Sequence, residues 1–210
     1  YIASLMPGEN VDFQRDREAH AAYLEKCRDY VRQLPPAANQ TKARVLFQHL
    51  RLQSELGRWT KEDFIEFLAL PRNKHELLKE SKAPAAEIVG EISSDTQLIT
   101  EGLGHFLSQT DDTGDFARFV DEDALSQIHA RARLLAGADP TRWGKLLPAP
   151  AFKELLDETS ISAVPGSPDF LTADEAISIG LDLKNTRDLL VRIFEIDVPS
   201  HVIRTGGDPV

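Results

Sequence analysis

The stretch His75-Glu76-Leu77-Leu78-Lys79 begins like the helix motif of zinc proteases. In that motif two histidines four residues apart bind zinc, and the glutamate serves as general base. Here Lys79 replaces the second histidine, and a protonated lysine cannot ligate a metal ion. We therefore interpret this stretch as an exposed helix face.

The acidic residues after position 110 follow the spacing of a calcium-binding loop. Positions 1, 3, 5 and 12 of the template correspond to Asp111, Thr113, Asp115 and Glu122. The sharp turn of such a loop needs glycine at its sixth position, where this chain has Phe116. We expect an acidic turn whose carboxylates cap the following helix, without calcium binding.

The single cysteine and the histidines are the residues whose side chains could serve as nucleophiles or metal ligands. Cys27 lies at helical spacing from His20 and Tyr23. A reactive Cys–His pair needs an activating environment and a third, orienting group, whereas a free cysteine on an apolar stripe is more often a small buried hydrophobe. His49 also lies on an apolar stripe, so we expect a hydrogen-bonded core histidine. Three others, His105, His129 and His201, have no second ligand at metal-binding spacing.

Phosphate-binding and nucleophile motifs are missing from the sequence. Gly102-Leu103-Gly104 lacks a third glycine and a preceding strand, and Gly206-Gly207 has no helix after it. No serine lies in a Gly-x-Ser-x-Gly elbow. The sequence therefore assigns no catalytic, cofactor-binding or metal-binding residue and predicts no cofactor.

Composition restricts the possible partners. The chain has 210 residues, with 34 acidic against 24 basic ones and a net charge of −10. So acidic a chain lacks the clustered cations that bind nucleic acid. No apolar run approaches the ~20 residues needed to span a bilayer, so we expect no membrane insertion. One cysteine excludes an intramolecular disulfide, which fits a cytoplasmic protein or a periplasmic or cell-envelope protein.

The elements that must position these residues are mostly helices. The clearest is a helical hairpin over 39–71, in which Gly57 ends the first helix and Thr60 with Asp63 forms a capping box for the second. A helix over about 12–34 precedes it. Gly102 and Gly104 fall inside an apolar helical pattern and favour close packing against a neighbour. The remaining helices are expected over about 75–81, 85–92, 95–107 (capped by Asp95), 116–120, 121–135, 140–147 and 150–156.

The pattern changes near residue 160. Residues 177–183 alternate apolar and polar side chains, which is typical of a half-buried strand. A turn at 184–187 and a second strand over 189–198 complete a predicted hairpin, and 161–164 and 202–203 are possible further strands. We thus predict a mainly α fold of packed helical hairpins with a short C-terminal β-hairpin or the start of a β-sandwich. It divides into a helical domain, 1–160, and a β segment, 161–210, and both ends look cut from a longer protein.

Two family resemblances follow from particular segments. The turn Leu56-Gly57-Arg58-Trp59 and the exit Ala69-Leu70-Pro71 resemble a tetratricopeptide repeat, although the second helix is a turn short and no second copy occurs. Three longer segments, 44–71, 130–143 and 181–196, resemble parts of large bacterial proteins with alpha-2-macroglobulin-like β-domains. That resemblance implies an accessory helical region beside a β-sandwich. The family's Cys-Gly-Glu-Gln thioester is absent, so no functional residue carries over.

These observations lead to a functional hypothesis. We expect a non-catalytic scaffold or protein-interaction module that binds a protein partner or neighbouring domains of its own chain. The C-terminal hairpin could also mediate self-association, because its second strand is apolar on both faces. The alternative is an enzyme or a metal-regulated domain whose site assembles only in three dimensions.

Overall fold

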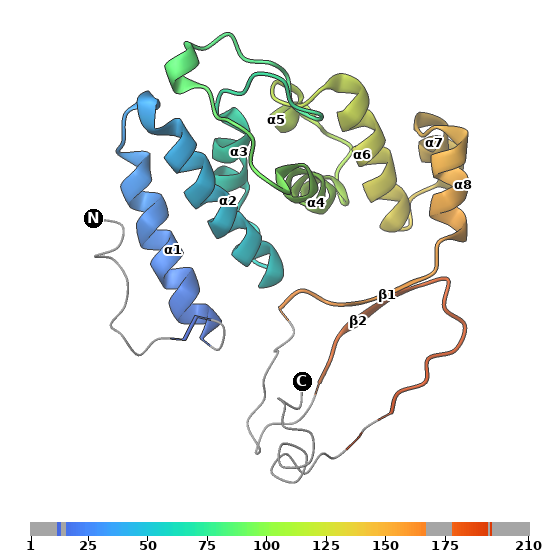
Figure 1. The fold of residues 1–210 in the computed structure, drawn as a ribbon. Helices are drawn as coiled ribbons and strands as arrows, with labels where there is room; N and C mark the ends of the chain where they lie inside the picture. Colours follow the sequence, from blue (N-terminus) through green and yellow to red (C-terminus); the bar gives the residue numbers. More distant parts are fainter. Residues whose placement is uncertain (1–11, 14–15, 167–177, 193, 195–210) are drawn as a thin grey trace.

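The computed structural model describes residues 12–13, 16–166, 178–192 and 194. These residues form mainly helices, followed by a two-stranded antiparallel sheet (Figure 1), which confirms the predicted fold class. The α-helices are α1 (Arg17–Arg32), α2 (Asn39–Glu55), α3 (Lys61–Ala69), α4 (Asp95–Leu107), α5 (Gly114–Ala117), α6 (Glu122–Leu135), α7 (Pro140–Trp143) and α8 (Ala149–Asp157). Three 3₁₀ turns, η2 (Pro36–Ala38), η3 (Ala85–Glu87) and η4 (Gly144–Leu146), and the strands β1 (Ser160–Ala163) and β2 (Leu181–Lys184) complete the described elements.

The central hairpin is α2 and α3, as the sequence predicts. Leu46 and Leu50 of α2 are fully buried, because α1, α3 and α4 pack around this helix. Gly57 has a φ of +67°, the left-handed conformation that lets glycine end a helix. The predicted capping box is wrong, since the Thr60 side chain caps nothing and Asp63 is buried.

The main core lies where α2, α3, α4 and α6 meet. Gly102 of α4 lies so close to α3 that an added Cβ would be 2.5 Å from the Phe64 ring. This glycine therefore permits the close packing expected of it, whereas a Cβ at Gly104 would meet nothing within 4 Å. Fully buried members of this core include Leu46, Leu50, Phe64, Phe67, Ile99, Leu103, Leu107 and Val120.

The segment between α3 and α4 is mostly irregular, so the helices predicted over 75–81 and 85–92 are wrong. Only the 3₁₀ turn η3 forms there. Arg72 pairs with Val89 in a parallel bridge, and Leu78 pairs with Val120 in an antiparallel one. Val89 and Leu78 are both buried, each next to a different bridge partner. These contacts with residues distant in the sequence outweigh the weak local preference for a helix.

The C-terminal sheet pairs different segments from those predicted. β2 pairs with β1, not with residues after 188: the described residues 189–192 and 194 lie in no strand. The Asn185 amide, at the end of β2, donates to the carbonyl oxygens of Leu156 and Glu158 and holds this end of β2 beside the start of β1. β1 confirms most of the strand expected at 161–164, while 195–198 and 202–203 lie outside the described residues. No helix in the described part is long and apolar enough to cross a membrane.

Candidate functional site

Polar side chains from three helices meet at Asp63 of α3. Arg28 and Arg32, one turn apart on α1, reach its two carboxylate oxygens at 2.8 and 2.6 Å. His49 of α2 donates from Nε2 to Oδ2 at 2.9 Å. The Asp63 side chain is only 3% exposed, so this is a buried ion-pair cluster.

The surroundings of Asp63 fix its charge. Burial raises the pKa of this carboxyl, but the hydrogen bond from His49 and the ion pairs with Arg28 and Arg32 outweigh burial and hold the pKa well below its usual range. Both oxygens are occupied, so the group cannot act as a general base. With the Nε2 proton directed at Asp63, His49 Nδ1 is buried without a hydrogen-bond partner among the described residues.

A second buried acid, Asp95, begins α4. Arg72 Nη1 donates to its Oδ2 at 2.6 Å, and His75 Nε2 lies 3.3 Å from its Oδ1. His75 Nδ1 accepts hydrogen bonds from the backbone N–H groups of Leu77 and Leu78 at 3.0 and 3.2 Å. Nδ1 thus acts as an acceptor, and Nε2 faces the Asp95 carboxylate. Burial raises the pKa of Asp95, but the hydrogen bond from His75 and the Arg72 charge outweigh it, so the pKa is lowered.

This second cluster lines a cavity of about 580 Å³, and a cavity with buried polar groups can be an active site. Ser93 and Ser94 line it too, and Ser94 has a φ of +68°. A serine nucleophile needs a histidine nitrogen to accept its proton, yet both ring nitrogens of His75 are already engaged. His75 is thus a half-buried loop residue, and its predicted place on an exposed helix is wrong.

The calcium-loop residues are directed at separate cations. Asp111 pairs with Arg142 at 2.9 Å, and Asp115 pairs with Lys61. Phe116 is 2% exposed in the core. Throughout the described ranges, no three His, Cys, Asp or Glu side chains are grouped to hold a metal ion.

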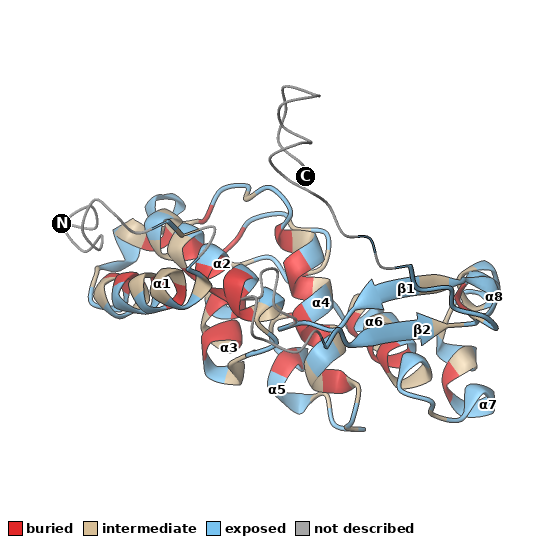
Figure 2. Ribbon diagram, turned by 90° about the horizontal axis from the view of Figure 1, so that it is seen from below, coloured by how far each residue is buried: buried red, intermediate tan, exposed pale blue. Residues whose placement is uncertain are grey.

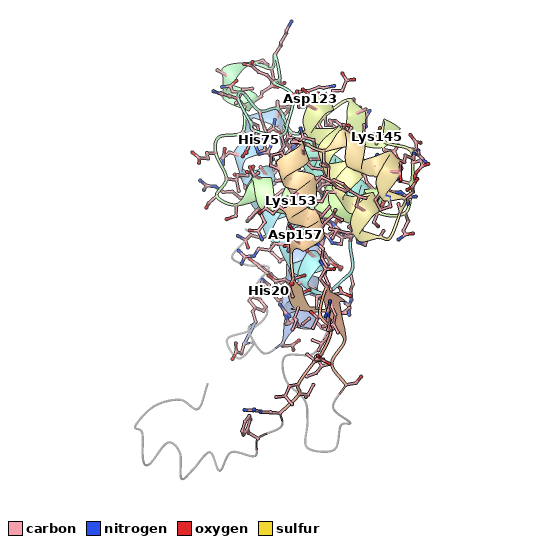
Figure 3. The ribbon with its side chains drawn as sticks, turned by 90° about the vertical axis from the view of Figure 1, so that its right-hand side faces the viewer. His20, His75, Asp123, Lys145, Lys153 and Asp157 are labelled. Carbon is pink, nitrogen blue, oxygen red and sulfur yellow. The ribbon has the colours of Figure 1, made fainter. Side chains whose placement is uncertain are left out.

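The cysteine and the other histidines lie apart from one another. Cys27 is 1% exposed, and His20 stacks on Phe13 with ring centroids 4.7 Å apart. Figure 3 shows the labelled His20 and His75 far apart. His129 lies against Trp143 and contacts the carbonyl oxygen of Thr110 at 2.7 Å. His201 lies outside the described residues.

A groove of about 680 Å³ runs between the α2–α3 turn, α4 and the chain after β1. Trp59 and His105 form its aromatic part, with stacked rings 6.0 Å apart. Burial lowers the pKa of His105, which favours a neutral ring. Glu101 supplies a carboxylate, and Ile179, 62% exposed, supplies an apolar edge. A half-buried tryptophan beside an exposed aliphatic residue is typical of protein-contact surfaces.

Neither the buried acids nor the groove stood out in the sequence. Asp63 and Asp95 occupy positions where a carboxylate normally caps a helix, so local spacing gave them that role. The sequence feature that points to the cluster at Asp63 is on α1. Arg28 and Arg32 share one face of that helix and could hold a single carboxylate between them.

Comparison with known proteins gives one family. A family model described as the actin-binding protein F N-terminal domain matches residues 1–159. Actin-binding protein F of Dictyostelium discoideum is 18% identical over 211 residues, which is 93% of this chain but only 9% of that protein. No solved structure matches the chain.

These matches correct the resemblances drawn from the sequence. The assignment to bacterial alpha-2-macroglobulin-like proteins is wrong, because the matching family and relative are those of a eukaryotic actin-binding protein. The tetratricopeptide likeness rested on one hairpin, which exists as α2 and α3, but the family model that matches is a different one. The chain belongs to the family of actin-binding protein F N-terminal domains.

Proposed function

We propose that this domain is a non-catalytic protein-interaction module whose partner is actin. The match of residues 1–159 to the N-terminal domain of an actin-binding protein carries the proposal. The geometry supports binding without turnover, because Asp63 and His75, which belong to the two buried polar clusters, have their polar atoms occupied within the fold. A module of this kind can serve as a scaffold that holds actin near another protein.

We place the contact surface at the groove beside Trp59. Hot spots of protein interfaces are enriched in tryptophan packed beside apolar side chains, with a polar rim around them. Trp59 lines its groove together with the apolar side chains of Ile179 and Val164 and the carboxylates of Glu101 and Glu55.

Co-sedimentation with actin filaments tests the proposal, using this chain and two charge reversals. Glu101→Arg changes the groove without touching the core, since Glu101 is exposed and its carboxylate accepts a hydrogen bond from the Gln97 side chain of the same helix. Glu154→Arg makes the same change on α8, where Glu154 is exposed. We expect the wild type and Glu154→Arg to pellet with filaments and Glu101→Arg to pellet less.

Two results would contradict this proposal. If the folded wild-type chain stayed in the supernatant at every filament concentration, actin would not be its partner. If both charge reversals pelleted like the wild type, actin binding would stand and the groove would be the wrong surface.

A further inference from the structure

The two-stranded sheet has its apolar face toward solvent. In the register Ile161↔Leu183 and Ala163↔Leu181, these four side chains lie on one face. Ile161, Leu181 and Leu183 are 54, 39 and 48% exposed. On the opposite face Lys184 pairs with Glu158, which Arg131 of α6 also contacts. Figure 2, in which the molecule is seen from below, shows both strands mostly in the colour of exposed residues.

The sheet also has an open edge along β2. The Val164 N–H donates to the carbonyl oxygen of Gly180 at 2.9 Å, which makes these opposed residues a hydrogen-bonded pair. Because such pairs alternate along an antiparallel ladder, Leu181 and Leu183 belong to non-hydrogen-bonded pairs. Their N–H and C=O groups therefore point away from β1, and the described residues provide no partner for them.

The chain itself carries a segment, 189–194, whose sequence suits this edge. Leu189, Leu190 and Val191 are 44, 75 and 66% exposed, and Phe194 is 76% exposed. They lie in no helix or strand, although leucine, valine and phenylalanine without proline suit a strand. In an extended conformation Leu189 and Val191 would lie on one face of the segment and Leu190 on the other.

We propose that two copies of this chain associate by exchanging strands, with 189–192 of each copy lying antiparallel along β2 of the other. Placing Leu183 opposite Val191 of the second copy puts Asp182 opposite Arg192. One face then gains an apolar pair and the other an ion pair at the close spacing of a non-hydrogen-bonded position. The exchange uses backbone groups of β2 that have no partner among the described residues.

Charge does not oppose this contact locally. Each copy carries a net charge of −10, which disfavours association in general. The segment 178–194, however, has three cations against two anions, for a net charge of +1: Lys184, Arg187 and Arg192 against Asp182 and Asp188. The inference is independent of actin binding and does not rest on it.

Light scattering across a range of concentrations tests the association. We expect the wild type to dimerise. Val191→Lys should lose the dimer because it places a charge in the apolar pair. Leu183→Pro should also lose it, since it removes an edge N–H that β1 does not use. The matched control is Leu146→Lys on η4. Leu146 is 46% exposed in the wild type, so this variant should dimerise normally.

A disulfide test separates exchange between copies from closure within one chain. The double variant Asp182→Cys, Arg192→Cys places a cysteine of one copy opposite a cysteine of the other. Residues opposed at a non-hydrogen-bonded position have a Cα separation of about 4.5 Å, which a disulfide can span. We expect oxidation to give a species of twice the monomer mass on a non-reducing gel. A crosslink within single chains would overturn the proposal. So would a wild type that is monomeric at all concentrations, or a dimer that both Val191→Lys and Leu183→Pro leave intact.

Discussion

Removing the carboxylate of Asp63 should destabilise the domain far more than removing a neighbouring exposed one. Asp63→Ala leaves Arg28, Arg32 and His49 without their shared acceptor in a site where the acid was 3% exposed. Breaking a buried ion pair from one side costs about 3–5 kcal/mol. Because Arg32 is 36% exposed and can be rehydrated, we expect a loss near the low end, about 3 kcal/mol.

Asp29→Ala is the matched control. Asp29 contacts the same two arginines, at 3.0 and 3.4 Å, but is 61% exposed. An exposed ion pair is worth roughly 0–1 kcal/mol. Urea denaturation should therefore separate the two variants by about 2 kcal/mol or more. The thermal midpoint of Asp63→Ala should fall by roughly 6–12 °C. Equal losses in the two variants would refute the claim that burial decides the strength of this cluster.

The same cluster predicts a pH dependence. The folded pKa of Asp63 lies below its unfolded value, so its contribution is fully present above the unfolded pKa of about 3.9. It is lost as the pH falls from there through the folded pKa. The stability difference between wild type and Asp63→Ala should therefore be constant near neutral pH and shrink below about pH 4. A difference that stayed constant under acidic conditions would contradict this sign.

Three further outcomes follow from the core and the acidic turn. Gly102→Ala should cost about 1–3 kcal/mol because its Cβ would meet the Phe64 ring, whereas Gly104→Ala should be neutral or stabilising by up to ~1 kcal/mol; the reverse order in urea would contradict this packing. Leu50→Asp should unfold the helical part, as it buries an unpaired charge, and an unchanged thermal midpoint would disprove it. Calorimetry should detect no calcium binding, and a site abolished by Asp111→Ala would overturn that expectation.

Helices with strong local signals were predictable from the sequence. The hairpin of α2 and α3 follows from an apolar helical period interrupted by Gly57, whose positive φ the structure confirms. Such signals lie within one or two turns of the chain, so sequence alone contains them. The sequence predicted that Gly102 packs closely against a neighbouring helix, but it did not identify Phe64 as the residue contacted.

The remainder depended on contacts between distant residues. Asp63 meets Arg28 and Arg32 across 31–35 positions, and nothing near Thr60 distinguishes a buried acceptor from a helix cap. Likewise β2 pairs with β1 rather than with the apolar segment that follows it, because period-two alternation identifies a strand without identifying its neighbour. The groove beside Trp59 arises only when α4 and the chain after β1 come together.

The cluster at Asp63 also selects how α1 sits on its neighbours. α1 buries Ala21, Leu24, Cys27 and Val31, and apolar burial of this kind is non-directional. A slip of one residue would shift α1 by about 1.5 Å and rotate its faces by about 100°, carrying Arg28 and Arg32 away from the carboxylate together. The acid thus adds a directional constraint on the register of α1 to the packing of Cys27 and Val31, and its loss should leave α1 helical but less tightly held in that register.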